Sequence, residues 1–173
     1  TSASFKSVNL NFENVSPLRF NISDFQIINE YIMPMKSPNI EHIFSKTPSR
    51  VLEDFINHKF ANRGNNKKAK IIIKEASIIE NKILNKNILN SIFMNENKTI
   101  YSGKLSVKIE FLSERGFVES YSNFQSLHEK TITGSLTLNN LQQVYLELLE
   151  ELIKGLNMEI DAQISSYFSD KLL

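Results

Sequence analysis

The sequence contains no cysteine, and its 173 residues include only five glycines and four prolines. Without cysteine, the chain has no disulfide framework, no thiolate zinc site and no thiol nucleophile. Neither a G-x-G-x-x-G nor a G-x-x-x-x-G-K phosphate loop is present. A run of about 18 apolar residues is also lacking, so the sequence predicts no membrane-spanning helix. These absences remove several classes of enzyme, redox protein and membrane channel.

An excess of charge of one sign is missing too. The chain carries 20 basic and 19 acidic residues, a net charge of +1. Proteins that follow a phosphate backbone usually have a basic face. The basic cluster of Lys67, Lys68 and Lys70 is interpreted as a solvated loop and strand start. We therefore expect no nucleic-acid partner.

The titratable residues form no catalytic or metal-binding pattern. His42, His58 and His128 are expected in a loop, a helix and a strand, and no H-E-x-x-H motif occurs. Glu147 and Glu151 stand four residues apart on a predicted helix, where a carboxylate pair could begin an acid–base site. Acidic residues at this spacing are also typical of a solvated helix face. We therefore expect no catalytic residue, no metal and no cofactor, and no enzyme activity.

Alternating apolar residues predict β-structure in the first third of the chain, over residues 5–12 and 18–31. A loop is expected to continue to about residue 46. Thr47 is a natural N-cap, and Pro48 at the first helical position loses no hydrogen bond. The apolar stripe that follows continues to Phe60, and Gly64 is expected to end the helix.

The remainder predicts three strands and a long helix. Alternation indicates strands over residues 69–84, 99–112 and 117–133, the last with a bulge near Ser122 and a turn before it that uses Gly116. Thr137 caps the final helix. Phe55 and Leu148 are expected to press the two helices onto the sheet. The sequence thus predicts one α+β domain over residues 1–173, with a mainly antiparallel sheet of four or five strands and two helices packed on one face.

One segment fits neither pattern. Between two well-defined strands, residues 83–98 place apolar side chains among asparagines: Ile88, Leu89, Ile92, Phe93 and Met94. A connection of this length is uncommon and is often functional. Two interpretations stay open: a short amphipathic turn tucked under the sheet, or an apolar flap that contacts lipid or a partner.

Several short motifs resemble a known group of proteins. They are Asn39-Ile40-Glu41-His42, Asn62-Arg63-Gly64, residues 76–80 and 101–107, and the acidic C-terminal helix. Together they resemble small lipoproteins of Gram-negative envelopes, of the alphaproteobacterial type. Those lipoproteins are similar in layout to the auxiliary lipoproteins of ABC-type transport systems and to the lipopolysaccharide-assembly lipoprotein.

The resemblance implies a non-catalytic periplasmic domain, anchored on the inner or outer membrane by a lipid-modified cysteine. Because the sequence begins with Thr1 and not Met, we expect processing of a longer precursor with that cysteine just upstream. Envelope transport or assembly proteins, and lipid, would be the partners. An adaptor that contacts only protein is the alternative, and an unfamiliar enzyme is a third possibility.

Overall fold

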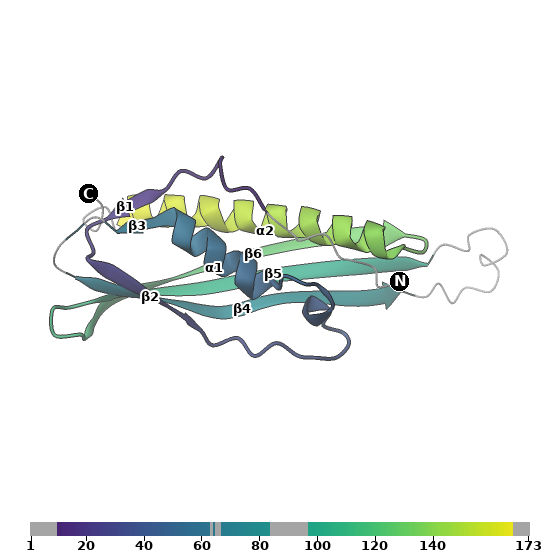
Figure 1. The fold of residues 1–173 in the computed structure, drawn as a ribbon, viewed down its shortest axis with the longest axis horizontal. Coiled ribbons are helices and arrows are strands. Elements are labelled where there is room, and N and C mark those ends of the chain that lie inside the picture. Colours follow the sequence, from purple (N-terminus) through teal and green to yellow (C-terminus); the bar gives the residue numbers. More distant parts are fainter. Residues whose placement is uncertain (1–9, 63, 65–66, 84–96, 168–173) are drawn as a thin grey trace.

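Three long strands lie side by side along the computed structural model, which describes residues 10–62, 64, 67–83 and 97–167 (Figure 1). Strand β4 (Lys68–Ile83) pairs antiparallel with β5 (Lys98–Leu112), and β5 pairs antiparallel with β6 (Val118–Thr133). In the β5–β6 turn Gly116 has a φ of 85°, a conformation that glycine adopts without steric cost. The three predicted strands and this turn are confirmed.

Parallel pairing distinguishes the start of the chain. Strand β2 (Asp24–Asn29) pairs parallel with β4, which gives the sheet order β2-β4-β5-β6. Strand β1 (Leu18–Phe20) pairs parallel with β3 (Phe60–Asn62) in a second, two-stranded sheet. Of the strand predicted over residues 5–12, only residues 10–12 are described, and they form no strand. The prediction of a mainly antiparallel sheet is confirmed, with β2 as its parallel exception.

The helices begin where their caps predict. Helix α1 (Pro48–Lys59) starts after Thr47, whose Oγ1 accepts from the Arg50 N–H at 3.4 Å. Helix α2 (Leu138–Tyr167) starts after Thr137, whose Oγ1 accepts from the Asn140 N–H at 3.2 Å. A short 3-10 helix, η1 (Glu41–Ile43), precedes α1. Each cap satisfies a backbone donor that the first helical turn leaves free.

The predicted end of the first helix is wrong. The chain passes directly from Lys59 into β3, so Phe60 starts a strand and does not continue the helical stripe. Gly64 lies beyond β3, and its N–H donates to the Ile22 carbonyl at 3.0 Å. A Cβ on Gly64 would lie 2.7 Å from the Ile22 nitrogen, so this glycine permits two backbones to approach closely.

A bulge in β4 changes which side chains face the core. The pairing with β5 shifts between Ile73 and Glu75. The extra residue reverses the alternation, so the core side of β4 carries Ala69, Ile71, Ile73, Ala76 and Ile78. An unbroken alternation would place Ile79 on the same face as Ile71 and Ile73, but the bulge turns it to the opposite face. The bulge predicted near Ser122 occurs in β6 between Val118 and Ser120, since Leu112 pairs with Val118 and Phe111 with Ser120.

Both helices cover the same face of the sheet, as predicted (Figure 1). Phe55 of α1 and Leu148 of α2 are buried in one hydrophobic cluster with Leu105 and Val107 of β5. The opposite face carries charged side chains that pair across strands, such as Lys104 with Glu75 at 2.9 Å. One face of the sheet therefore supports the core, and the other is a charged surface.

Helix α2 approaches the sheet at two glycines. A Cβ on Gly103 of β5 would lie 2.4 Å from Cδ1 of Leu152. A Cβ on Gly155 of α2 would lie 2.6 Å from Oγ of Ser126. Each glycine leaves space for a side chain of the other element, so the helix lies close against β5 and β6.

Candidate functional site

The apolar segment singled out in the sequence lies outside the described residues. Ile88, Leu89, Ile92, Phe93 and Met94 all belong to residues 84–96. Both of its interpretations therefore stay predictions. The strands on either side are described, and β4 ends at Ile83 while β5 starts at Lys98.

A hollow of about 600 Å³ opens beside these strand ends. Its size is within the usual range of small-molecule sites. The end of β4, the start of β5 and the connection into α2 contribute its walls. The lining residues are Glu80, Lys82, Asn97, Thr99, Tyr101, Gly134, Ser135, Leu136 and Leu141.

Polar groups and apolar groups line different parts of this hollow. The Tyr101 hydroxyl donates to Glu80 Oε2 at 2.9 Å, and Lys82 Nζ lies 3.7 Å from Glu80 Oε1. Burial raises the pKa of Tyr101, and the hydrogen bond and negative charge of Glu80 raise it further. Tyr101 therefore stays protonated, and its hydroxyl proton is donated to Glu80. Leu136 and Leu141 add apolar surface at the start of α2, so the hollow can accept a molecule with one polar and one apolar part.

The glutamates of α2 lie in a second, open hollow of about 440 Å³, with Glu147, Glu150 and Glu151 facing His128 and Lys130 of β6. Glu147 forms an ion pair with Lys130 and accepts from Gln143 Nε2 at 3.2 Å. No group of three His, Asp or Glu side chains suited to a metal occurs in the described part of the chain. The acidic face of α2 is therefore a surface whose Glu147 is paired with Lys130 of β6.

The first two histidines lie apart, in α1 and in η1. His58 Nε2 lies 3.0 Å from the Val15 carbonyl, and Asp54, four residues before it on α1, pairs with Lys46 at 2.5 Å. His42 lies in η1 and its Nδ1 is buried without a hydrogen-bond partner.

A buried polar cluster beside His42 was missed in the sequence. Glu41 is fully buried, and its Oε1 accepts from the Tyr31 hydroxyl and from Asn39 Nδ2 at 3.2 Å. Its Oε2 is buried with no hydrogen-bond partner. Burial raises the pKa of Tyr31, as does the hydrogen bond to Glu41. The sequence showed Asn39 and Glu41 only as part of a motif, and no local pattern indicated that Tyr31 would reach them.

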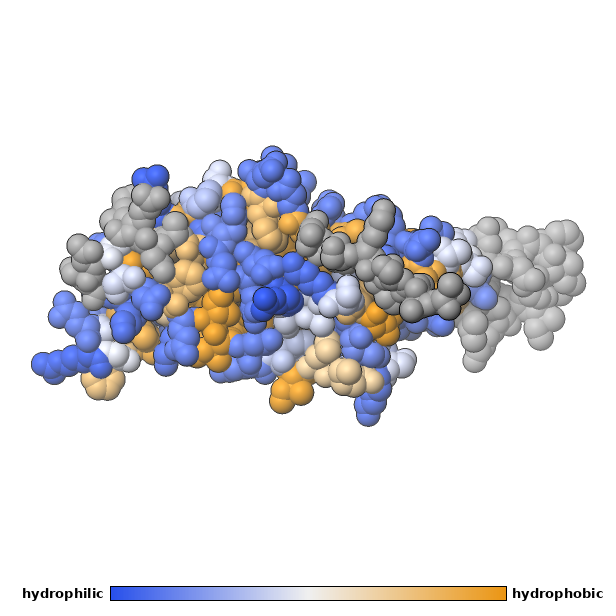
Figure 2. All heavy atoms as spheres, in the orientation of Figure 1, coloured by the Kyte–Doolittle hydropathy of each residue, from blue (hydrophilic) through white to orange (hydrophobic). Residues whose placement is uncertain are grey.

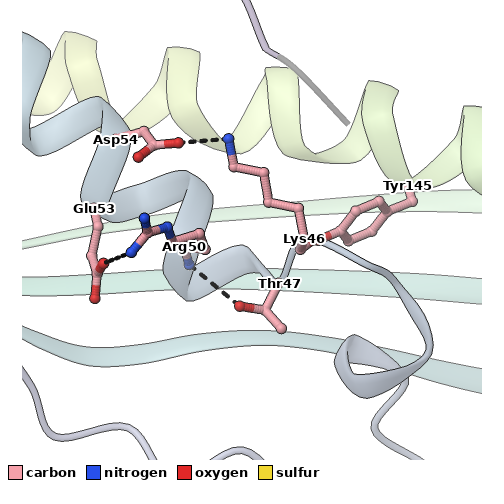
Figure 3. Close-up of polar contacts among 6 residues, drawn as sticks. All are labelled: Lys46, Thr47, Arg50, Glu53, Asp54 and Tyr145. Atoms are coloured by element: carbon pink, nitrogen blue, oxygen red, sulfur yellow. Dashed lines mark hydrogen bonds and ion pairs between the residues drawn. The ribbon is translucent and has the colours of Figure 1, made fainter. Parts of the chain in front are cut away.

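The segment that leaves this cluster is fixed to both helices (Figure 3). The ring of Phe44 stacks on Tyr145 with 3.7 Å between centroids, and the Tyr145 hydroxyl donates to the Lys46 carbonyl at 2.5 Å. Lys46 then pairs with Asp54 of α1. Burial, and next the negative charge of Glu41, raise the pKa of Tyr145. Residues 41–47 are therefore held between the sheet, α1 and α2.

Comparison with known proteins gives likenesses in structure alone. No protein-family model matches the chain, and no curated protein sequence matches it. A minor lipoprotein from Acinetobacter baumannii is similar, with 14% identity, a TM-score of 0.39, and coverage of 87% of this chain and 95% of that chain. A Helicobacter pylori protein named as a homologue of neuraminyllactose-binding hemagglutinin has 8% identity and a TM-score of 0.44, covering 95% and 99%.

A third similar structure, from Caulobacter crescentus, is also named as a lipoprotein. It has 10% identity and a TM-score of 0.43, with coverage of 86% of this chain and 93% of that chain. Such low identities and TM-scores assign neither a family nor a function to this chain. None of the helices within the described ranges combines the length and apolar composition that crossing a bilayer requires.

Proposed function

We propose that this chain is a non-catalytic lipoprotein domain of the Gram-negative periplasm that binds a lipid in the hollow at the strand ends. The observation that carries the proposal is the composition of that hollow. Leu136 and Leu141 offer apolar contact, while Lys82 offers a cation and the Tyr101 oxygen, whose proton is donated to Glu80, offers a hydrogen-bond acceptor. A lipid has a matching apolar chain and an anionic, hydrogen-bonding head.

The sequence resemblance to envelope lipoproteins supports the cellular setting. In this proposal an acylated cysteine, N-terminal to the domain, holds it at a membrane. The bound lipid would be received from, or passed to, an envelope transport or assembly complex. Sequencing the gene upstream of Thr1 tests the anchor, because a lipid-modified cysteine must follow a signal segment there.

Native mass spectrometry of the purified domain tests lipid binding. The wild-type domain is expected to retain a lipid-sized mass, and Leu141→Arg is expected to remove it by placing a charge in the apolar part of the hollow. Leu138→Arg is the matched control, because Leu138 lies in the same first turn of α2 but is 62% exposed. Circular dichroism of each variant checks that the fold is intact.

Two results would contradict the proposal. One is a wild-type domain that carries no lipid after purification and takes none up from detergent-solubilised envelope lipids. The other is equal lipid retention by the Leu141 and Leu138 variants. Either would leave the adaptor that contacts only protein as the better description.

A further inference from the structure

A loop of apolar residues projects from the molecule between β2 and η1. This apolar loop, residues 31–40, contains Ile32 and Met35 with exposed fractions of 89% and 68%. Met33 and Pro34 between them are partly exposed. Hydrophobic atoms project from the lower margin of Figure 2, where Figure 1 draws this loop. Isolated exposed apolar residues are ordinary, but a consecutive group at a projecting point is typical of a contact site.

The apolar loop is held in place along its length. The Glu30 N–H donates to the Ile73 carbonyl at 3.0 Å where the loop leaves β2. At its return, the Ile40 N–H donates to the Ile78 carbonyl at 3.0 Å, and the Glu80 N–H donates to the Pro38 carbonyl at 2.9 Å. These bonds fix the loop to the edge of β4.

The buried polar cluster ties the two ends of the loop together. Tyr31 stands at its start and Asn39 near its end, and both donate to the same oxygen of Glu41. Opening of the loop would take both donors away from the buried Oε1 of Glu41, so the cluster resists opening. The exposed Ile32 and Met35 are therefore presented by a rigid support and not by a flexible tail.

The charge around the loop indicates what it contacts. Within residues 31–40, Lys36 is the one charged residue, and it is exposed. The acidic residues on either side of the loop do not present a free negative charge at its surface, since Glu30 pairs with Lys74 at 2.6 Å and Glu41 is buried. The projecting part of the loop is thus apolar and positive, which complements the apolar interior and anionic headgroups of a bilayer.

We infer that the apolar loop is a docking element for an anionic membrane surface, where Ile32 and Met35 enter the interfacial region and Lys36 contacts headgroups. A bilayer fits better than a protein partner, because a stable protein interface involves about 20–30 residues on each side. The apolar loop, with two strongly exposed apolar side chains, supplies far fewer interface residues. A bilayer, by contrast, adapts to the shape of the loop.

Co-sedimentation with vesicles tests the inference. The soluble domain is expected to bind vesicles of phosphatidylethanolamine and phosphatidylglycerol, and to bind pure phosphatidylcholine less. Replacing both Ile32 and Met35 by Ser should weaken binding by about a hundredfold, because each of the two lost apolar contacts contributes about tenfold. The melting temperature of this double variant should stay near that of the wild type, since both side chains are exposed in the folded protein. Lys36→Glu should weaken binding to the phosphatidylglycerol vesicles alone.

The matched control replaces Leu138 and Met158 of α2 by Ser, because their exposed fractions are 62% and 63%. This variant should bind vesicles like the wild type. Equal losses in both double variants would overturn the inference, as would a wild-type domain that binds neither kind of vesicle, a result that would favour a protein partner. The lipid-binding hollow is tested separately, because Leu141→Arg leaves the apolar loop unchanged.

Discussion

At the scale of single residues, the ammonium of Lys59 is a buried charge that joins distant parts of the chain. Lys59 is fully buried at the end of α1, and its Nζ donates to the Ser16 carbonyl at 2.8 Å and to Asp161 Oδ1 at 2.6 Å. The Asp161 side chain is 44% exposed. The two partners therefore differ in how much water can replace a lost contact.

This difference predicts unequal effects of mutation. Asp161→Ala should lower the free energy of unfolding by about 2–3 kcal/mol, because it leaves a buried ammonium without its counter-charge. Lys59→Met should cost only about 1 kcal/mol, since Met fills a similar space and water can solvate the remaining carboxylate. Urea unfolding measures both variants. A larger loss for Lys59→Met would show that packing, and not charge, dominates at this position.

At the scale of elements, the contact of α2 with β6 gives a test through Gly155. Glycine inside a helix normally costs about 1 kcal/mol relative to alanine. Here Gly155→Ala should instead destabilise the domain by about 1–2 kcal/mol, because the added methyl group would lie 2.6 Å from Ser126 Oγ.

The same contact supplies the control. In a Ser126→Ala background the oxygen is gone, and Gly155→Ala should become neutral or stabilising by up to about 1 kcal/mol. Thermal or urea unfolding of the four proteins completes the cycle. Independent effects of the two changes would mean that α2 does not lie as close to β6 as the structure has it.

The edge strand β6 offers a second test at this scale. Its Gln125 N–H donates to Glu159 Oε2 of α2 at 3.0 Å, and Gln163 links Glu159 to Ser122. Unpaired backbone N–H groups on an edge strand promote association between molecules. A side chain that accepts a hydrogen bond from such a group therefore reduces association. Glu159→Ala should therefore increase self-association at high concentration, as followed by light scattering. Glu159→Gln, whose side-chain oxygen can still accept, should remain monodisperse like the wild type.

The sequence predicted those features that depend on contacts between residues close together in the chain, and missed those that depend on distant contacts. Thr47 and Thr137 predicted helix starts because a cap acts within three residues. The β4 bulge could not be predicted, because an unbroken alternation fits Ile71, Ile73 and Ile79 equally well. The parallel partner of β2 could not be predicted either, since strand alternation carries no information about the neighbour.

The sites show the same limit. Tyr31 and Glu41 meet because a loop returns along the edge of β4, and the hollow lined by Tyr101 and Leu141 forms where the ends of β4 and β5 meet α2. Neither arrangement has a signature in nearby residues. The exposed Ile32 and Met35 are visible in the sequence as apolar residues, but only the structure separates them from the core.

At the scale of the whole molecule, three tyrosines, two buried and one partly buried, link stability to alkaline pH. Burial raises the pKa of Tyr31, Tyr101 and Tyr145, and neighbouring carboxylates raise it further. The folded state thus holds these protons more tightly than the unfolded state. Their contribution to stability is complete below the ordinary tyrosine pKa of about 10 and is lost as pH rises above it.

The domain should therefore become progressively less stable above about pH 10, as measured by urea unfolding at a series of pH values. Tyr145→Phe should make this alkaline decline shallower, because one titrating group is removed. It should also lower stability at neutral pH by about 1 kcal/mol through the lost hydrogen bond to the Lys46 carbonyl. An alkaline slope equal to that of the wild type would contradict the role of Tyr145.

The parallel pairing of β2 with β4 has a consequence for the order of folding. Strands β5 and β6 and helix α2 each pack against the element that precedes them in the chain. Strand β2 reaches β4 only across a crossover that contains α1, and such non-local pairing forms slowly because a long loop must close first. Residues 68–167 are therefore expected to assemble early, with residues 18–62 docking onto a sheet that already exists. A destabilising change in β2 should then mainly speed unfolding, whereas one in β5 should also slow folding.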